Sequence, residues 1–199
     1  ISTQAAEKLY RVLPGDPPVS IATRIEIAAG GRAEWFAQEA ILFDQARLHR
    51  RTEARLSGDA RLLAVESLVL GRSAMGERFR TGAINDQWRV WRDGRLVWAD
   101  GLHLSGDIEG LAALPWGLGD ATALATLVYA GPDALSFLPL ARDLTAGETS
   151  GATLVNGILL LRLLAADAAA LRVRVSTALC ALRSAAFGLP PRLPAVWTC

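Results

Sequence analysis

The sequence is poor in the residues that most often catalyse reactions or hold metal ions. Its 199 residues include two histidines, two cysteines, one methionine and a single lysine, Lys8. Cys180 falls within an expected helix and Cys199 at the last position, which is not the pattern of a secreted disulfide framework. His49 and His103 stand alone, without HxH, HExxH or CxxC spacing. We expect a reduced, cytoplasmic protein with no firm metal site, in which both histidines are ordinary strand residues and Cys180 is a core residue.

Motifs for nucleotide binding and nucleophilic catalysis are also missing. There is no Walker A loop, and Lys8 follows no glycine-rich turn. Gly117-Leu118-Gly119 lacks the third glycine of a dinucleotide fingerprint. A GxSxG elbow, a Ser-x-x-Lys motif and a cysteine beside a candidate base are likewise absent. We therefore predict that the protein is not an enzyme.

The chain has neither a long apolar run nor an excess of charge of one sign. Its strongest apolar run, 158–164, is interrupted by Arg162 and is too short to cross a bilayer. The first residues show no basic and apolar signal-peptide regions. With 21 basic and 20 acidic residues the formal charge is +1, which does not favour nucleic acid or an anionic membrane as partner. A hydrophobic content of 51% is enough for a substantial core.

Alternating apolar and polar residues predict strands over residues 19–28 and 46–56, because this is the period of a half-buried strand. In the second segment Leu48, Ala54 and Leu56 share one side. The opposite side carries Arg47, His49, Arg51, Glu53 and Arg55. We expect that side to present a charged ribbon to solvent or to a partner.

An Asp-Gly pair at Asp93-Gly94 separates two strand-like runs and predicts a hairpin with a type I′ turn. A two-residue loop would place Arg92 opposite Arg95 and Trp91 opposite Leu96. It would also place Val90 opposite Val97, and Arg89 opposite Trp98 as a cation–π pair.

The segment after residue 120 adds helices to the pattern. We expect a strand over 121–130, a short helix over 133–144, and strands over 152–155 and 158–165 joined at Asn156-Gly157. A long helix should begin after Asp167 as N-cap and end at Gly188. Its apolar stripe is Leu171, Val175, Leu179 and Leu182. The sequence thus predicts one mainly β domain over 1–199, β-rich to residue 130 and mixed α/β over 131–199, with two α-helices towards the C-terminus.

Acidic residues within apolar strands are the most informative polar positions. Glu66 lies inside the run 61–70, where an acid costs several kcal/mol unless it is paired or reached by water. One interpretation is a structural ion pair with Arg72 or Arg47, and another is the polar lining of an internal channel or interface. Weaker cases are Glu39, Asp44, Asp86 and Asp100.

Several blocks, in order over nearly the whole chain, resemble the UreD family of urease accessory proteins, called UreH in some bacteria. They are 2–11 (STQAAEKLYR), 34–41 (EWFAQEAI), 61–63 (RLL), 70–72 (LGR), 75–79 (MGERF), the hairpin from Trp88 to Trp98, and Trp197-Thr198. Two departures stand out. Phe36-Ala37-Gln38-Glu39 replaces the usual Leu-Pro-Gln-Glu, and the N-terminal part of the family pattern, with its Gly-Gly-Asp segment, has no counterpart here.

The resemblance implies an irregular β-helix-like, multi-stranded fold and a role in urease maturation. UreD-like proteins are expected to bind UreF, through it the GTPase UreG, and to dock the assembly on apo-urease for nickel delivery. No tightly bound cofactor is implied, and nickel would be a transient cargo. An internal tunnel would be lined by polar residues, because carboxylates replace part of a cation's hydration without trapping it. The candidates are Gln38, Glu39, Glu66, Asp86 and Asp100.

Two other functions remain open at the level of the residues. One is a β-rich enzyme whose active site carries no recognised motif. The other is a ligand- or carbohydrate-binding β module that uses Trp88, Trp91 and Trp98, although aromatic pairs on a hairpin more often pack within the protein.

Overall fold

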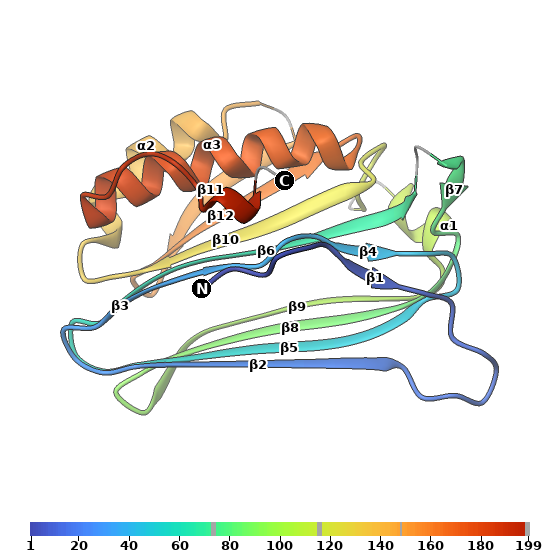
Figure 1. The fold of residues 1–199 in the computed structure, drawn as a ribbon, viewed down its shortest axis with the longest axis horizontal. Helices are drawn as coiled ribbons and strands as arrows, with labels where there is room; N and C mark the ends of the chain where they lie inside the picture. Colours follow the sequence, from blue (N-terminus) through green and yellow to red (C-terminus); the bar gives the residue numbers. More distant parts are fainter. Residues whose placement is uncertain (73–74, 115–116, 148, 198–199) are drawn as a thin grey trace.

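The strands form two stacked sheets in a computed structural model that describes residues 1–72, 75–114, 117–147 and 149–197 (Figure 1). The large sheet consists of β1 (Glu7–Leu9), β3 (Arg32–Phe36), β4 (Ala40–Leu42), β6 (Arg61–Arg72), β7 (Glu77–Arg78), β10 (Ala123–Ala130), β11 (Ser150–Val155) and β12 (Ile158–Ala165). The small sheet consists of β2 (Val19–Ile27), β5 (Arg47–Leu56), β8 (Thr81–Arg92) and β9 (Arg95–Asp107).

The chain winds back and forth between the two sheets. It runs from β2 in the small sheet to β3 and β4 in the large one, then to β5, β6 and β8 in alternation. Strands that become neighbours in this way are parallel: β2–β5, β5–β8, β3–β6 and β4–β6. This winding is that of a two-sided β-helix, which confirms the mainly β, β-helix-like prediction. The later pairs β8–β9, β6–β10, β10–β12 and β11–β12 are antiparallel.

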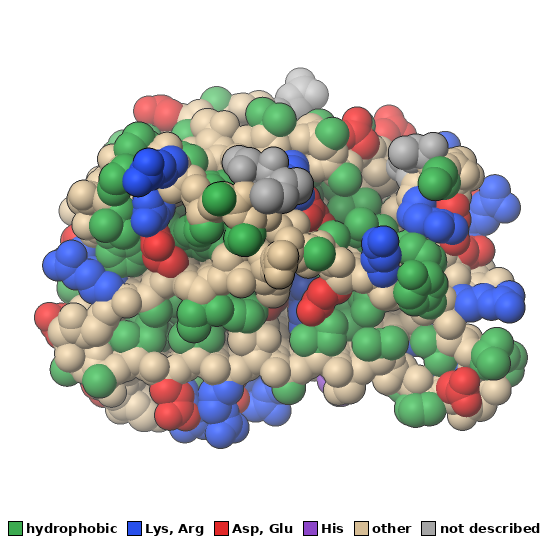
Figure 2. Space-filling view, viewed as in Figure 1, with side chains coloured by type: hydrophobic (Ala, Val, Ile, Leu, Met, Phe, Trp, Pro, Cys, Tyr) green, Lys and Arg blue, Asp and Glu red, His purple; other side chains and the backbone are tan. Residues whose placement is uncertain are grey.

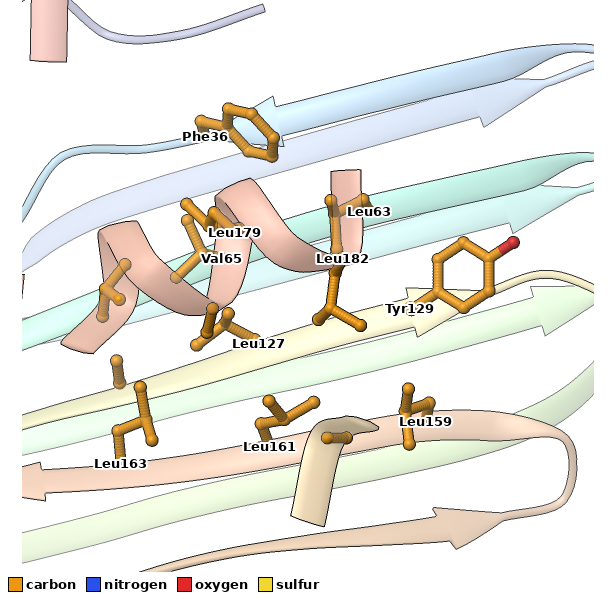
Figure 3. Close-up of a cluster of buried hydrophobic side chains, with 14 of the residues drawn as sticks. Phe36, Leu63, Val65, Leu127, Tyr129, Leu159, Leu161, Leu163, Leu179 and Leu182 are labelled. Carbon is orange, nitrogen blue, oxygen red and sulfur yellow. The ribbon is translucent and has the colours of Figure 1, made fainter. Parts of the chain in front are cut away.

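Two helices cover the outer face of the large sheet, as Figure 1 shows. They are α2 (Leu138–Leu144), preceded by the 3₁₀ turn η2 (Ala134–Phe137), and α3 (Ala168–Phe187). The Asp167 carboxylate accepts a hydrogen bond of 2.8 Å from the Ala170 amide, and Gly188 ends α3 at φ 64°. The predicted stripe of α3 is buried against the strands (Figure 3). No described helix is both long and apolar enough to span a membrane.

A short helix between β9 and β10 was not predicted. This helix, α1 (Ile108–Ala112), begins at Asp107, whose side chain accepts a hydrogen bond from the Gly110 amide. Five residues give too few turns for a helical period to appear in the sequence. The chain ends its described part with the 3₁₀ turn η3 (Ala195–Trp197).

The two predicted hairpin turns are present. Asp93 and Gly94 have φ of 49° and 77°, and Asn156 and Gly157 have 48° and 80°, as a type I′ turn requires.

The predicted register of the first hairpin is only partly right. Trp91 faces Leu96 and Arg92 faces Arg95, but a bulge beyond Trp91 places Val90 opposite Trp98 and Arg89 opposite Ala99. The extra residue takes up one position on β9, and sequence alternation does not reveal it. The expected pairing of Arg89 with Trp98 is therefore wrong. Instead Trp98 packs at 6.1 Å from Trp88, and Arg55 lies over the ring of Trp91.

The large sheet is buried on both faces, by helices on one side and by the small sheet on the other. Residues 62–71 of β6 are accordingly all buried, which explains their nearly unbroken apolar sequence. Figure 3 shows the cluster between sheet and helices, where Leu63 and Val65 meet Leu179 and Leu182. Because both faces of β6 are buried, solvent does not reach Glu66 through the large sheet.

We predict that Leu179→Ala on α3 lowers the free energy of unfolding by about 2–5 kcal/mol, because it removes a fully buried side chain and leaves a cavity. Leu135→Ala, at a position that is 66% exposed, is the matched control and should change stability by less than about 0.5 kcal/mol. Urea titrations of both variants measure the difference. Equal losses would contradict the packing of α3 on the sheet.

Candidate functional site

Six of the strands that border the space between the sheets place polar side chains there. We call this set the polar row. Its members are Arg50 and Thr52 of β5, Glu66 of β6, Asp86 of β8, Asp100 of β9, Thr126 of β10 and Arg162 of β12. Strand pairing explains the alignment: Glu66 faces Thr126, which faces Arg162, across the large sheet, and Arg50 faces Asp86 in the small one.

The polar row divides the core between the sheets into two hydrophobic clusters. On β5, Leu48 belongs to one cluster and Ala54 to the other. On β8, Ile84 and Trp88 lie on either side of Asp86 in the same way. A polar layer that crosses an entire core is unusual, because buried charges are costly unless they are paired. The interactions within the row therefore decide whether the two sheets can stack.

Arg50 is the centre of the polar row and connects the two sheets. Its Nε and Nη2 donate to the two oxygens of Asp86 at 2.9 and 2.6 Å, a bidentate pair. Nε also lies 3.4 Å from Oε2 of Glu66, on the opposite sheet. The side chains of Arg50 and Glu66 are only 5% and 3% exposed, so this contact is hardly screened by water.

Glu66 is incompletely satisfied in this arrangement. Its Oε1 accepts a hydrogen bond from the Thr52 hydroxyl. Its Oε2 has no hydrogen-bond donor among the described residues, because the Nε hydrogen of Arg50 points to Asp86. Burial raises the pKa of Glu66, and the positive charge of Arg50 only partly opposes this. Burial acts to lower the pKa of Arg50, but the charges of Glu66 and Asp86 outweigh it and raise that pKa.

The polar row reaches the surface on one side through Arg162. Its guanidinium pairs with Asp100 and donates to the Thr126 hydroxyl at 3.0 Å. Asp100 and Arg162 are partly exposed, unlike Arg50 and Glu66. A cavity of about 330 Å³, lined also by Leu118 and Ser150, borders Arg162 here. Between the sheets the space narrows to about 10 Å³, room for about one water molecule.

On the other side the polar row faces the edge strand β1. Glu7 shares its register with Ala40 and Leu68, which belong to the core between the sheets. Glu7 is itself exposed, yet its charge acts on the pKa of both Arg50 and Glu66. Figure 2 shows acidic and basic side chains at the seam between the two layers on this face. Charged groups thus extend from one edge of the sandwich to the other.

Three of the five predicted lining residues, Glu66, Asp86 and Asp100, meet in the polar row. The other two, Gln38 and Glu39, lie in the connection between β3 and β4 and contact the helical layer. Gln38 Nε2 donates to the backbone oxygen of Val196 at 2.7 Å, and Glu39 pairs with Arg172 of α3 at 3.0 Å.

The ion-pair partner of Glu66 corrects the sequence interpretation. It is Arg50, whereas Arg72 pairs with Glu77, and Arg47 binds the backbone oxygens of Leu13 and Asp16. Sequence reasoning also missed Thr52, Thr126 and Arg162. The signal for Arg50 was present, because alternation in β5 places it on the same side as Leu48 and Ala54. Thr126 and Arg162 carried no signal of their own, since only strand pairing aligns them with Glu66.

The remaining candidate residues lie away from this site. His49 and His103 are exposed on the outer side of the small sheet. Trp88 and Trp98 are buried, so they cannot form an open platform for a sugar. Cys180 is half-buried on α3, where burial raises its pKa, and Cys199 lies outside the described residues. Among the described residues no group of three or more His, Cys, Asp or Glu side chains converges as a metal site.

The sequence of this chain is similar to those of known proteins. A sequence model of the family described as UreD urease accessory protein matches residues 1–198. A urease accessory protein UreD of Rhizobium leguminosarum bv. viciae is 44% identical over 197 residues, covering 99% of this chain and 70% of the relative. The UreD protein of a Methylobacterium species is 46% identical over 205 residues, with the same coverages. The UreD protein of Granulibacter bethesdensis is 42% identical, and 82% of its length is covered.

We predict that Arg50→Met lowers the free energy of unfolding by about 3–5 kcal/mol, because it leaves two buried carboxylates without their cation. Arg80→Met, at an exposed arginine without an ion-pair partner among the described residues, should change stability by less than about 0.5 kcal/mol. Chemical denaturation of both variants at neutral pH measures this. Exposed ion pairs contribute less than about 1 kcal/mol to stability. If Arg50→Met lowers the free energy of unfolding by no more than that, the described geometry is contradicted.

A second prediction concerns pH. The pKa of Glu66 in the folded protein lies above its ordinary value of 4.5, so the folded state binds this proton more tightly than the unfolded state. The contribution of Glu66 to the free energy of unfolding must then fall as the pH rises from about 4.5 through the folded pKa. Subtracting the stability of Glu66→Gln from that of the wild type, pH by pH, isolates this slope. A difference that rises or stays level across that window would refute the raised pKa.

Proposed function

The chain belongs to the UreD family of urease accessory proteins, and from that premise we propose that it is a non-enzymatic, cytoplasmic scaffold for nickel delivery. In this proposal it links UreF, and through it the GTPase UreG, to apo-urease, and it assists the passage of nickel into the urease active site. GTP hydrolysis is assigned to UreG, which agrees with the absence of a P-loop from this sequence. This chain contributes binding surface and a polar route.

The observation that carries the proposed route is the polar row with its excess of acidic groups. Glu66, Asp86 and Asp100 outnumber Arg50 and Arg162, and Glu7 adds a further negative charge at the edge. Carboxylate oxygens can replace part of the hydration of a divalent cation, and they bind it loosely when they do not form a closed cage. A row of them that runs from one edge of the sandwich towards the other suits transit better than storage.

The narrowest point of the proposed route is the contact of Arg50 with Glu66 and Asp86. Space for one water molecule does not admit a hydrated cation, so the guanidinium groups must move aside for nickel to pass. A divalent cation and Arg50 then compete for the same carboxylates. Oxygen Oε2 of Glu66, which lacks a hydrogen-bond donor among the described residues, is the first ligand this chain can offer in the interior.

The test replaces the charge of Glu66 without changing its size. Glu66→Gln should lower the nickel content of urease about tenfold at a fixed activation time, the effect of raising a barrier by about 1.4 kcal/mol. Glu66→Asp, which keeps the charge, should retain much more activity. Urease activity and bound nickel are measured after co-expression of the urease subunits with the full set of accessory proteins.

Glu39 provides the matched control for this experiment, because it is also a buried glutamate, 8% exposed against 4% for Glu66, and it pairs with Arg172 outside the polar row. Glu39→Gln should deliver nickel normally once the complex has assembled, and co-purification of the complex shows whether it has. Normal nickel loading with Glu66→Gln in an assembled complex would end the proposal of a route through the polar row. Normal nickel loading of urease when this chain is left out of the co-expression would contradict the proposed function itself.

A further inference from the structure

No described helix lies over the outer face of the small sheet (Figure 1). Acidic and basic side chains gather along this lower side of the molecule (Figure 2). Strand register places Arg24 of β2 beside Glu53 of β5, and Glu53 beside Arg89 of β8. Arg51 and Arg55 flank Glu53 along β5. Glu53 is therefore surrounded by four arginines, one on each side. We call these four arginines, together with Glu53, the arginine face.

Glu53 is buried although it lies on a face that no other described element covers. Its side chain is only 6% exposed, while those of Arg51 and Arg55 are 48% and 51% exposed. Arg51 Nη2 and Arg55 Nε donate to its two oxygens at 2.8 and 2.6 Å. The hydrogen bond from Arg55 is the main cause that lowers the pKa of Glu53; burial opposes it and Arg51 adds to it. The carboxylate thus stays ionised and holds both guanidinium groups in place.

The arginines of this face keep most of their hydrogen-bonding capacity. A guanidinium has five N–H donors, and Arg51 and Arg55 each use one nitrogen on Glu53. Arg24 and Arg89 have no ion-pair partner within 4 Å among the described residues. Including Glu26, which faces Arg55, the face carries an excess of two positive charges, more than the formal +1 of the whole chain. This face is therefore net positive in a chain whose acidic and basic residues nearly balance.

We propose that the arginine face binds a carboxylate-rich surface of a partner protein. Arginine pairs with carboxylates in a bidentate geometry, and it is enriched at protein interfaces. Because Glu53 already orders Arg51 and Arg55, less side-chain entropy is lost when they bind. The inference rests on the proposed scaffold function only for the identity of the partner. It does not depend on the polar row, which lies on the opposite side of the same strands.

A protein partner fits this face better than nucleic acid or a membrane. Strong binding to a duplex uses about six to ten phosphate contacts, whereas this face offers four arginines with Glu53 between them and Glu26 at its side. Those two glutamates would repel a continuous row of phosphates. A carboxylate surface can instead place its charges over the arginines alone. Trp91, the aromatic residue of this region, is half-buried under Arg55 and is not free to enter a bilayer.

The experiment uses the full chain and a fluorescent synthetic peptide rich in Glu and Asp. Binding is followed by anisotropy, with a peptide of the same length carrying Gln and Asn as the uncharged reference. Arg24→Gln combined with Arg89→Gln should weaken binding of the acidic peptide about tenfold, because two exposed ion pairs are lost. This double variant leaves the hydrogen bonds of Glu53 intact and should keep the wild-type melting temperature.

The matched control is Arg80→Gln combined with Arg142→Gln, which removes two exposed arginines elsewhere on the surface and should bind the acidic peptide as the wild type does. Equal affinity of wild type and Arg24→Gln/Arg89→Gln, or no preference over the uncharged peptide, would overturn the proposal. So would tighter, face-dependent binding of duplex DNA or of phosphatidylserine vesicles. Glu66→Gln should bind the peptide normally, so a failure of the nickel route would leave this inference standing.

Discussion

The contact of Arg50 with Glu66 and Asp86 is the constraint on which the stacking of the two sheets depends. It is the buried point where charge from the small sheet meets charge from the large sheet, whereas the contact of Arg162 with Asp100 is partly exposed. Hydrophobic clusters lie on both sides of it. Stability alone does not require such a site, because apolar residues of similar volume often replace a buried ion pair without loss. The free-energy cost of burying these charges is instead compatible with a functional role for charged groups inside the sandwich. Any ligand that enters the polar row must compete with Arg50, so fold stability and the proposed passage involve the same three side chains.

The winding of the chain explains how residues far apart in sequence reach this one layer. Because β2, β5 and β8 stack in parallel, Arg50 and Asp86 become neighbours across 36 residues. The antiparallel strands β10 and β12 then bring Thr126 and Arg162 into line with Glu66. The same strand register thus produces both the β-helix-like winding and the polar row. A slip of one residue in any of these strands would turn its polar group out of the layer between the sheets.

Two nearly buried glutamates show how differently the surroundings can act on the same side chain. Glu53 receives hydrogen bonds from two half-exposed arginines, and its pKa is lowered. Glu66 lies deeper, with one threonine donor and an arginine that is shared with Asp86, and its pKa is raised. The first is a stable anion that orders a surface. The second is a carboxylate whose charge is costly in the folded state and which a cation in the layer between the sheets would stabilise.

The sequence by itself determined most of the elements of this protein. Alternation gave β2 and β5, the Asp93-Gly94 and Asn156-Gly157 pairs gave two hairpin turns, and Asp167 and Gly188 bounded α3. These features are local, because period, cap and turn depend on residues a few positions apart. The tertiary structure decided the rest: the bulge in β9, the pairing of Glu66 with Arg50 rather than with Arg72 or Arg47, and the separation of Gln38 and Glu39 from the polar row. Each of these depends on strand register between distant segments. Side-chain alternation shows that Arg50 faces inward, but only the packing of one sheet on the other decides what it meets there.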